Sequence, residues 1–170
     1  NNHTITFNSN GGTADTMATQ SLVWGTTKGL LTNTFTKTGY SFQGWSTSSS
    51  GAVQYTNGAN LTMGTGNVIL YAKWAPSTYT VEYNGNGSDG GWTDSSLHTY
   101  DVAKNLTANA FTRTGHTFTG WATSPTGGVV YTNGQSVINL EASGMTILYA
   151  VWNANSYTVS FSANGGTGSA

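Results

Sequence analysis

Cysteine is absent from the 170-residue chain, and proline occurs only 2 times. The lack of cysteine excludes disulfide bonds, thiolate nucleophiles and cysteine-based metal sites. Charged residues make up only 6% of the chain, where about 25% is usual for soluble proteins. The net charge is -1 and no basic stripe is present, which argues against a nucleic-acid partner. No long apolar run occurs, so we expect no membrane insertion.

The sequence contains an internal repeat. Residues 35–45 read FTKTGYSFQGW, and residues 111–121 read FTRTGHTFTGW, so that 7 of the 11 pairs are identical. The offset is 76 residues, as from Gly39 to Gly115. A fixed period of this length is typical of tandem modules, and it determines the architecture before any single motif does.

The period predicts two modules, residues 1–76 and 77–154, followed by the first strand and turn of a third copy in residues 155–170. Short linkers are predicted at residues 75–77 and 153–155. Modules of about 75 residues are near the lower limit for burying a self-sufficient core, so each must use its aromatic residues efficiently. The pattern begins and ends mid-repeat, and we therefore expect the sequence to be a piece of a longer chain.

Each copy shows several strand signals. In the first copy, apolar and polar residues alternate over residues 4–7, 21–24 and 40–45, and residues 68–74 are rich in β-formers. Leu61 and Met63 are predicted to sit on one short helical turn. Residues 156–161 resemble the first strand of a repeat, and we expect this segment to pair with an exposed sheet edge, in its own chain or in a neighbouring chain.

Together these pieces resemble a known family. The opening Tyr-Thr-Val-x-Phe, Asn-Gly-Gly, Thr-Gly-Tyr-x-Phe-x-Gly-Trp and the closing Ile-Leu-Tyr-Ala-x-Trp are similar to the Listeria–Bacteroides repeat, which includes the B-repeat of internalin-type surface proteins. The resemblance covers both copies and the start of the third. Lys and Glu are scarcer here than in internalin-type repeats, and His116 stands where Tyr40 keeps the usual tyrosine.

The resemblance implies a fold and a setting. The expected fold class is mainly β, with β-grasp-like α+β modules, tandem small mixed sheets and at most a short helix per repeat. Such modules occur in tandem in bacterial surface or secreted proteins. The family has no catalytic motif to carry over, and the resemblance implies no enzymatic activity.

Residues that recur in both copies are interpreted as structural. The recurring large side chains are predicted to form the core, and a sugar-stacking platform in each copy is the alternative. These pairs are Trp45/Trp121, Phe42/Phe118 and Phe35/Phe111 at an offset of 76 residues, and Trp74/Trp152 and Tyr71/Tyr149 at an offset of 78. The offset widens because the second copy carries two extra residues between Gln135 and Thr146, as in a loop insertion.

The acidic residues and the histidines do not recur, whereas Lys28 recurs as Lys104 with no recurrent acid to accompany it. None of the 6 acidic residues has an acidic counterpart at the repeat offset, whereas a paired-carboxylate hydrolase needs two acids across a cleft. The 3 histidines match no metal-ligand spacing, and no Gly-x-Ser-x-Gly motif occurs. We therefore expect no enzyme, no cofactor and no metal site.

One loop is singled out as a weak candidate for partner contact. Trp92 lies in the Gly-rich tip 89–92, and its counterpart in the first copy is Thr16, so the fold does not require a ring there. An exposed Trp could contact a ligand or partner, and the alternative is a ring folded back over its own module. Asp89 and Asp94 flank the tip and are interpreted as a solvated loop, with a weak calcium site as the alternative.

The predicted function is a non-catalytic spacer or stalk of an adhesin-like bacterial cell-surface or secreted protein, displaying other domains outside the cell. The alternative is a module that binds a glycan or protein through its exposed loops or sheet edge. The partners would be host or cell-surface proteins or glycans, together with neighbouring repeats of the same chain. A shared exposed aromatic patch on both copies would favour binding.

Overall fold

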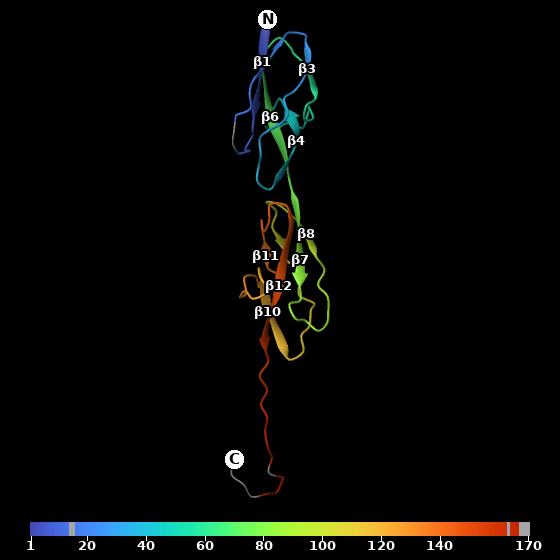
Figure 1. The fold of residues 1–170 in the computed structure, drawn as a ribbon, viewed down its shortest axis with the longest axis vertical. Helices are drawn as coiled ribbons and strands as arrows, with labels where there is room; N and C mark the ends of the chain where they lie inside the picture. The colour runs from blue at the N-terminus through green and yellow to red at the C-terminus, as the bar shows by residue number, and fades with distance from the viewer. Residues whose placement is uncertain (14–15, 163, 167–170) are drawn as a thin grey trace. The chain divides into compact units, whose positions relative to one another are not determined.

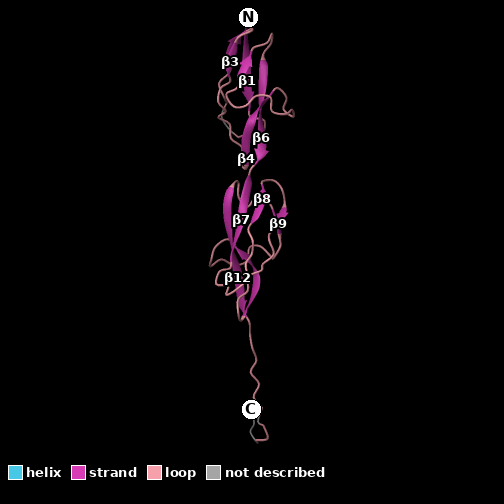
Figure 2. Ribbon diagram, turned by 90° about the vertical axis from the view of Figure 1, so that its right-hand side faces the viewer, coloured by secondary structure: helices cyan, strands magenta, loops and turns pink. Residues whose placement is uncertain are grey.

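The computed structural model describes residues 1–13, 16–162 and 164–166. Within this part of the chain every regular element is a β-strand, and no helix is present (Figures 1 and 2). The strands are β1 (Asn2–Asn8), β2 (Gln20–Val23), β3 (Thr27–Gly29), β4 (Tyr40–Ser46), β5 (Asn60–Thr62), β6 (Val68–Pro76), β7 (Thr78–Asn84), β8 (Ser96–Thr99), β9 (Lys104–Asn105), β10 (His116–Ala122), β11 (Ser136–Val137) and β12 (Gly144–Ala154).

The first repeat forms a four-stranded mixed sheet in the order β2-β1-β6-β4. β1 pairs in parallel with β6 and antiparallel with β2, and β6 pairs antiparallel with β4. In β1, Ile5 and Phe7 are buried and alternate with polar residues that are less buried, as the period-2 pattern predicts. The mixed sheet and the mainly β class are therefore confirmed.

A separate pair of short strands completes the repeat. β3 and β5 form a two-stranded antiparallel sheet in which Lys28 faces Leu61. The prediction of a helical turn at Leu61 and Met63 is wrong. Both side chains are buried with the exposed Thr62 between them, and that alternation belongs to a strand rather than a helix. The expected α+β character is accordingly not confirmed.

The second repeat has the same strand pattern. Its sheet order is β10-β12-β7-β8, and β9 pairs with β11. The register shifts between Phe42 and Gly44 in β4, and between Phe118 and Gly120 in β10. Gly44 has φ 142°, and a Cβ there would lie 2.5 Å from the Tyr55 carbonyl oxygen. This bulge therefore requires glycine, which accounts for its recurrence.

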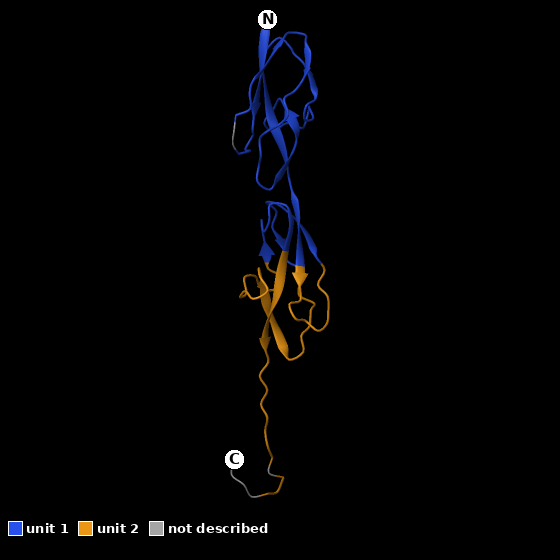
Figure 3. Ribbon diagram, viewed as in Figure 1, with its two compact units in different colours: residues 1–82, 95–106, 136–146 blue, residues 83–94, 107–135, 147–170 orange. Residues whose placement is uncertain are grey.

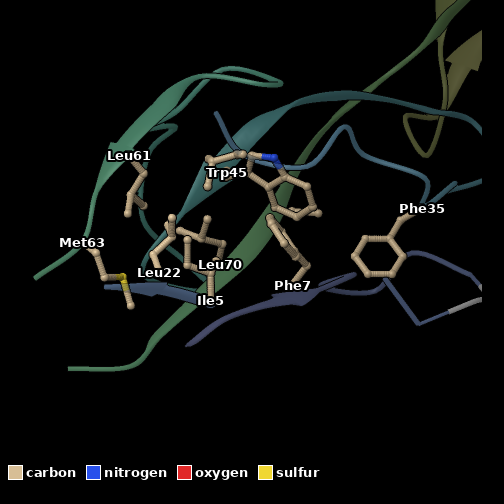
Figure 4. Packing of buried hydrophobic residues seen from close by; sticks show 10 residues of the cluster. Ile5, Phe7, Leu22, Phe35, Trp45, Leu61, Met63 and Leu70 are labelled. Carbon is tan, nitrogen blue, oxygen red and sulfur yellow. The ribbon is translucent and has the colours of Figure 1, made fainter. Parts of the chain in front are cut away.

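The core of the first repeat is built around Trp45 (Figure 4). Its ring is 0% exposed and packs against Phe7 at 4.9 Å and Phe42 at 4.9 Å between ring centroids. Trp121 makes the equivalent contact with Phe118 at 4.9 Å. The indole N–H groups of both Trp45 and Trp121 are buried without a hydrogen-bond partner in the described structure, so the rings act as apolar cores.

A second tryptophan closes each repeat through a hydrogen bond. Trp74 Nε1 donates to the Ser9 carbonyl oxygen at 2.8 Å, and Trp152 Nε1 donates to the Gly85 carbonyl oxygen at 2.8 Å. Each indole joins the last long strand of its repeat to the turn that follows the first strand. The prediction that the recurring tryptophans are structural fits this geometry.

The chain divides into two compact units (Figure 3). Unit 1 contains residues 1–82, 95–106 and 136–146, and unit 2 contains residues 83–94, 107–135 and 147–170, as far as these are described. The first repeat and parts of the second thus belong to one unit.

Two expectations about the connections differ from the structure. β6 continues to Pro76 and β7 starts at Thr78, so most of the predicted linker at 75–77 belongs to a strand, and β12 likewise continues to Ala154.

The prediction that residues 156–161 pair with a sheet edge of their own chain is wrong, and pairing with the edge of a neighbouring chain stays a prediction. These residues form no strand, and Phe161 is 94% exposed. The equivalent β1 pairs with β2 and β6, which come later in its own repeat. The described residues after Ala154 contain no counterpart of either strand.

Candidate functional site

The tip at residues 89–94 is held against the segment 110–114 of unit 2. The Asp89 N–H donates to the Thr112 carbonyl oxygen at 2.9 Å, and the Thr112 N–H donates to the Gly90 carbonyl oxygen at 2.8 Å. Gly91 has φ 73°, and a Cβ there would lie 2.0 Å from the Ala110 carbonyl oxygen. This close approach requires glycine and places the next residue, Trp92, on the surface.

Trp92 is 72% exposed, yet it is partly anchored. Its Nε1 donates to Asp94 Oδ1 at 3.0 Å, and its ring edge meets Phe111 at 6.3 Å between centroids. The ring is therefore held in place by its own repeat while most of its surface remains open to solvent. Such a pre-positioned aromatic ring could contact a partner at little entropic cost.

Asp89 and Asp94 bind different groups. Asp89 Oδ2 accepts a hydrogen bond from the Thr114 N–H at 2.6 Å. Hydrogen bonds from Thr114, first through its side chain and then through its backbone, hold the pKa of Asp89 below its usual value. Across the described residues, no group of three or more His, Cys, Asp or Glu side chains could hold a metal ion.

A shallow depression of about 390 Å³ opens beside this tip. Asp89, Arg113, His116, Phe118 and Trp152 are among the residues that line it. Trp92 and Asp94 are not among its lining residues, so the three residues singled out from the sequence do not form one pocket.

A second cluster lies within unit 1, where the ring of Tyr100 covers Gly39. We call Gly39 and Tyr40 the Gly39 corner, and Tyr100 and Asp101 the Tyr100 turn. A Cβ on Gly39 would fall 2.3–2.4 Å from three atoms of the Tyr100 ring. The rings of Tyr40 and Tyr100 meet edge to face at 5.8 Å. Bare glycine backbone is thus a requirement of this contact.

Polar contacts surround the same cluster. Tyr40 Oη donates to Asp101 Oδ2 at 2.6 Å, and Asn139 Nδ2 donates to Asp101 Oδ1 at 2.7 Å. The bond to Asp101 raises the pKa of Tyr40, and the bonds from Tyr40 and Asn139 lower the pKa of Asp101. Lys37 Nζ lies 4.0 Å from the centre of the Tyr40 ring. The arrangement is a structural contact, and it leaves no free acid–base pair.

Comparison with known proteins agrees with this repeated architecture. The family model of the Listeria-Bacteroides repeat domain matches residues 3–73 and again residues 79–151. The chain belongs to the Listeria-Bacteroides repeat family. The two matches place one family repeat in each half of the chain.

Two relatives of this repeat protein come from Evansella cellulosilytica. One, named "Putative Gly-rich membrane protein", is 33% identical over 136 residues, which is 79% of this chain and 15% of the relative. The other, named "Putative membrane protein", is 32% identical over 103 residues, which is 61% of this chain and 14% of the relative. The chain therefore spans about one seventh of the length of these relatives.

No solved structure matches the chain. The described residues include no helix that is long and apolar enough to cross a membrane.

The sequence singled out the tip of the second repeat of this Listeria-Bacteroides repeat pair as a candidate, but not the cluster at Gly39. The contact joins residues 61 apart, Tyr40 and Asp101, and no local pattern records such a distance. One signal was available, since an aromatic residue recurs as Trp24 and Tyr100 while Gly39 recurs as Gly115. The recurrence did not show that the two features meet.

His98 is a further site that differs between the repeats. Its side chain is 1% exposed and stacks on Tyr79 at 5.3 Å, whereas its counterpart in the first repeat is the buried Leu22. Burial, and then the nearby charge of Lys104, lower the pKa of His98. The folded state therefore favours the neutral ring.

We expect a His98→Leu substitution to weaken the pH dependence of stability. The folded-state pKa lies below the unfolded value of about 6.5, so the contribution of neutral His98 is present above that pH. It is lost as the pH falls through the folded pKa, because the unfolded chain then takes up the proton first. Urea unfolding at pH 7.5 and 5.5 measures the slope, and an unchanged slope in the variant would contradict the assignment.

Proposed function

We propose that the chain is a non-catalytic tandem-repeat spacer of a bacterial cell-surface or secreted protein, which displays other domains away from the cell. The observation that carries this proposal is that the recurring residues serve to fold the repeats and to connect them. Trp45 and Trp121 fill cores, Trp74 and Trp152 close the repeats, and Gly39 receives a ring from the next repeat. What recurs between the repeats is therefore used to fold and connect them.

Membership of the repeat family and the printed names of the relatives support a structural role at the cell envelope. The chain spans only a small part of each relative, which leaves room in those proteins for other domains. The stability of such an array is approximately the sum of module and interface terms, so that length can grow by adding repeats.

The non-catalytic part of the proposal is supported by the distribution of acidic residues. No acid recurs between the repeats. Asp89 and Asp101 are each engaged by hydrogen bonds within the fold. These hydrogen bonds hold the pKa values of both carboxyl groups low, which is opposite to the raised value that a general acid needs at neutral pH.

The spacer role is tested by inserting the chain between a cell-wall anchor and an epitope tag on a bacterial surface. Antibody binding to the tag is expected to rise when the intact chain is present. A double variant, Trp45→Ala with Trp121→Ala, has the same length without its two central core rings and serves as the matched control. Equal antibody binding to both insertions would contradict a role that depends on the folded repeats.

Binding of a glycan or protein is the second candidate function, and the exposed ring of Trp92 favours it. If this loop is a contact site, a Trp92→Ala variant should lose most glycan-array or cell-surface binding while keeping its unfolding midpoint, because an exposed aromatic hot spot contributes about 2 kcal/mol or more. Phe161→Ala is the matched control, since Phe161 is also exposed, at 94%. Binding that survives in the Trp92 variant would remove this loop from consideration.

A further inference from the structure

The Gly39 corner and the Tyr100 turn together form a complete contact. Each of these two halves also has a counterpart in the chain that stands without the other half. The residue equivalent to Gly39 at the repeat offset is Gly115, and the residue equivalent to Tyr100 is Trp24. We call Gly115 and His116 the Gly115 corner, and Trp24 and Gly25 the Trp24 turn. Both halves keep the backbone geometry of the complete contact.

The Gly115 corner matches the Gly39 corner in its backbone conformation and its backbone hydrogen bonds. Gly115 has φ 70° and Gly39 has φ 73°. The Gly115 carbonyl oxygen accepts the Asn155 N–H at 2.8 Å, as the Gly39 carbonyl oxygen accepts the Ser77 N–H at 2.8 Å. The difference is the missing ring: a Cβ on Gly115 would meet only the Tyr157 hydroxyl, at 3.9 Å, among the described residues. Gly39 is buried, and Gly115 is partly exposed.

The Trp24 turn likewise matches the Tyr100 turn. The Trp24 N–H donates to the Asn1 carbonyl oxygen at 3.1 Å, as the Tyr100 N–H donates to the Ser77 carbonyl oxygen at 2.9 Å. Gly25 and Asp101, the residues that follow, both have positive φ, 79° and 59°. Trp24 is 62% exposed, whereas Tyr100 is partly buried on Gly39. The Trp24 turn thus has the same local backbone conformation as the Tyr100 turn, but its ring lacks a glycine corner to cover.

The polar groups of the two open halves are also compatible. In the complete contact, the Tyr40 hydroxyl binds the Asp101 carboxylate. The Gly115 corner has His116 in place of the hydroxyl, and the Trp24 turn has Gly25 in place of the carboxylate. His116 Nδ1 already lies 2.9 Å from the Thr114 carbonyl oxygen. A contact between these halves would therefore leave neither an unpaired carboxylate nor an unpaired phenol.

We propose that the Trp24 turn and the Gly115 corner are docking surfaces for other modules of this same family. The Trp24 ring covers the glycine corner of a preceding repeat, and the Gly115 corner receives an aromatic ring from a following repeat. The contact is an aromatic ring on bare glycine backbone with an edge-to-face neighbour, as in the Gly39 cluster. This inference rests on the proposed spacer role and names the contact by which successive repeats connect.

The test joins two copies of the chain in the register of the repeats. Asn155 and Asn1 each take one role of Ser77, because the Asn155 N–H binds the glycine corner and the Asn1 carbonyl oxygen binds the aromatic turn. Residues 1–154 are therefore followed directly by a complete second copy beginning at Asn1. The Trp24 turn of the second copy then faces the Gly115 corner of the first. Because the chain has no cysteine, introduced cysteines can carry spin labels at defined positions.

Two label pairs provide matched distance measurements by electron paramagnetic resonance. Ser50→Cys with Ser95→Cys, both exposed positions of unit 1, reports on the existing contact in the single chain. Thr126→Cys in the first copy with Thr19→Cys in the second copy is the equivalent pair across the seam. We expect both pairs to give one narrow distance distribution, and we expect Trp24→Ala in the second copy to abolish the narrow peak across the seam.

Trp92→Ala in the second copy is the matched control, because it removes another exposed indole outside the seam and should leave the narrow peak in place. A seam distribution that is broad from the start, or that ignores Trp24→Ala, would overturn the docking proposal. If the Ser50/Ser95 pair stays narrow in that case, the spacer role survives with its existing contact. A broad distribution for both pairs would contradict the spacer role itself.

Discussion

Trp45→Ala is expected to destabilise the first repeat by about 3–5 kcal/mol, the range for truncating a large buried aromatic residue. The ring is 0% exposed and packs against Phe7, Phe35 and Phe42, so its removal leaves a cavity at the point where the aromatic contacts converge. Marginal stabilities of about 5–15 kcal/mol make this a large share of the total. Urea unfolding followed by circular dichroism measures the effect.

Trp45→Phe separates packing from polarity. The Trp45 Nε1 makes no hydrogen bond in the described structure, so a smaller ring forfeits only part of the packing. We expect Phe to cost clearly less than Ala. Similar losses for the two variants would indicate that the indole N–H stabilises the core, which would contradict the apolar role assigned to this ring.

Gly39→Ala is expected to have the second large effect. Two penalties combine at this position: a side chain at φ 73°, and a Cβ that would fall 2.3 Å from the Tyr100 ring. The positive φ costs roughly 1–2 kcal/mol in a residue with a Cβ, and overpacking typically adds about 1–3 kcal/mol. The clash forces Tyr100 off the Gly39 corner, and the Tyr40–Asp101 hydrogen bond is expected to weaken with it.

Gly115→Ala supplies the matched control, because Gly115 has φ 70° and its nearest contact for a Cβ is the Tyr157 hydroxyl at 3.9 Å. This variant carries the backbone penalty without the clash. The difference between the two unfolding free energies therefore isolates the contribution of the ring contact, and we expect Gly39→Ala to be worse by about 1–3 kcal/mol. Equal losses would show that the Tyr100 ring does not depend on the glycine.

The main sheet of each repeat was predictable because its signals are local. Period-2 alternation and β-forming residues gave β1, β4 and β6 to within a few residues, and the 76-residue offset transferred the pattern to the second repeat. Gly44 recurs as Gly120, and the bulge with its close approach to Tyr55 explains why glycine is kept in both repeats.

The short strands β3 and β5 were not predictable from their own sequences. Each has 3 residues, and Lys28 and Gly29 carry little β signal. Pairing with a strand more than 30 residues away provides their hydrogen bonds, so the tertiary structure decides the conformation. The prediction of a helical turn at Leu61 and Met63 failed because two apolar residues in a polar segment fit either a helical turn or a strand.

The candidate site was only partly accessible from the sequence. The sequence left open whether the Trp92 ring is exposed or folded back over its own repeat, and it did not indicate the hydrogen bond to Asp94. The Gly39 contact was missed because it joins separate repeats through Tyr40, Tyr100 and Asp101. Comparing the two repeats becomes informative only once the complete Gly39 contact is known. The comparison then shows which equivalent residues, at Trp24 and Gly115, lack the other half of the contact.

Single-molecule pulling on the 170-residue chain tests the central claim most directly, namely that each repeat is a structural module with its own aromatic core. The account predicts two separate unfolding steps, each releasing roughly the extended length of one repeat. Trp45→Ala should lower the force of one step and leave the other. A smooth extension without steps, or a single step for the whole chain, would contradict the account.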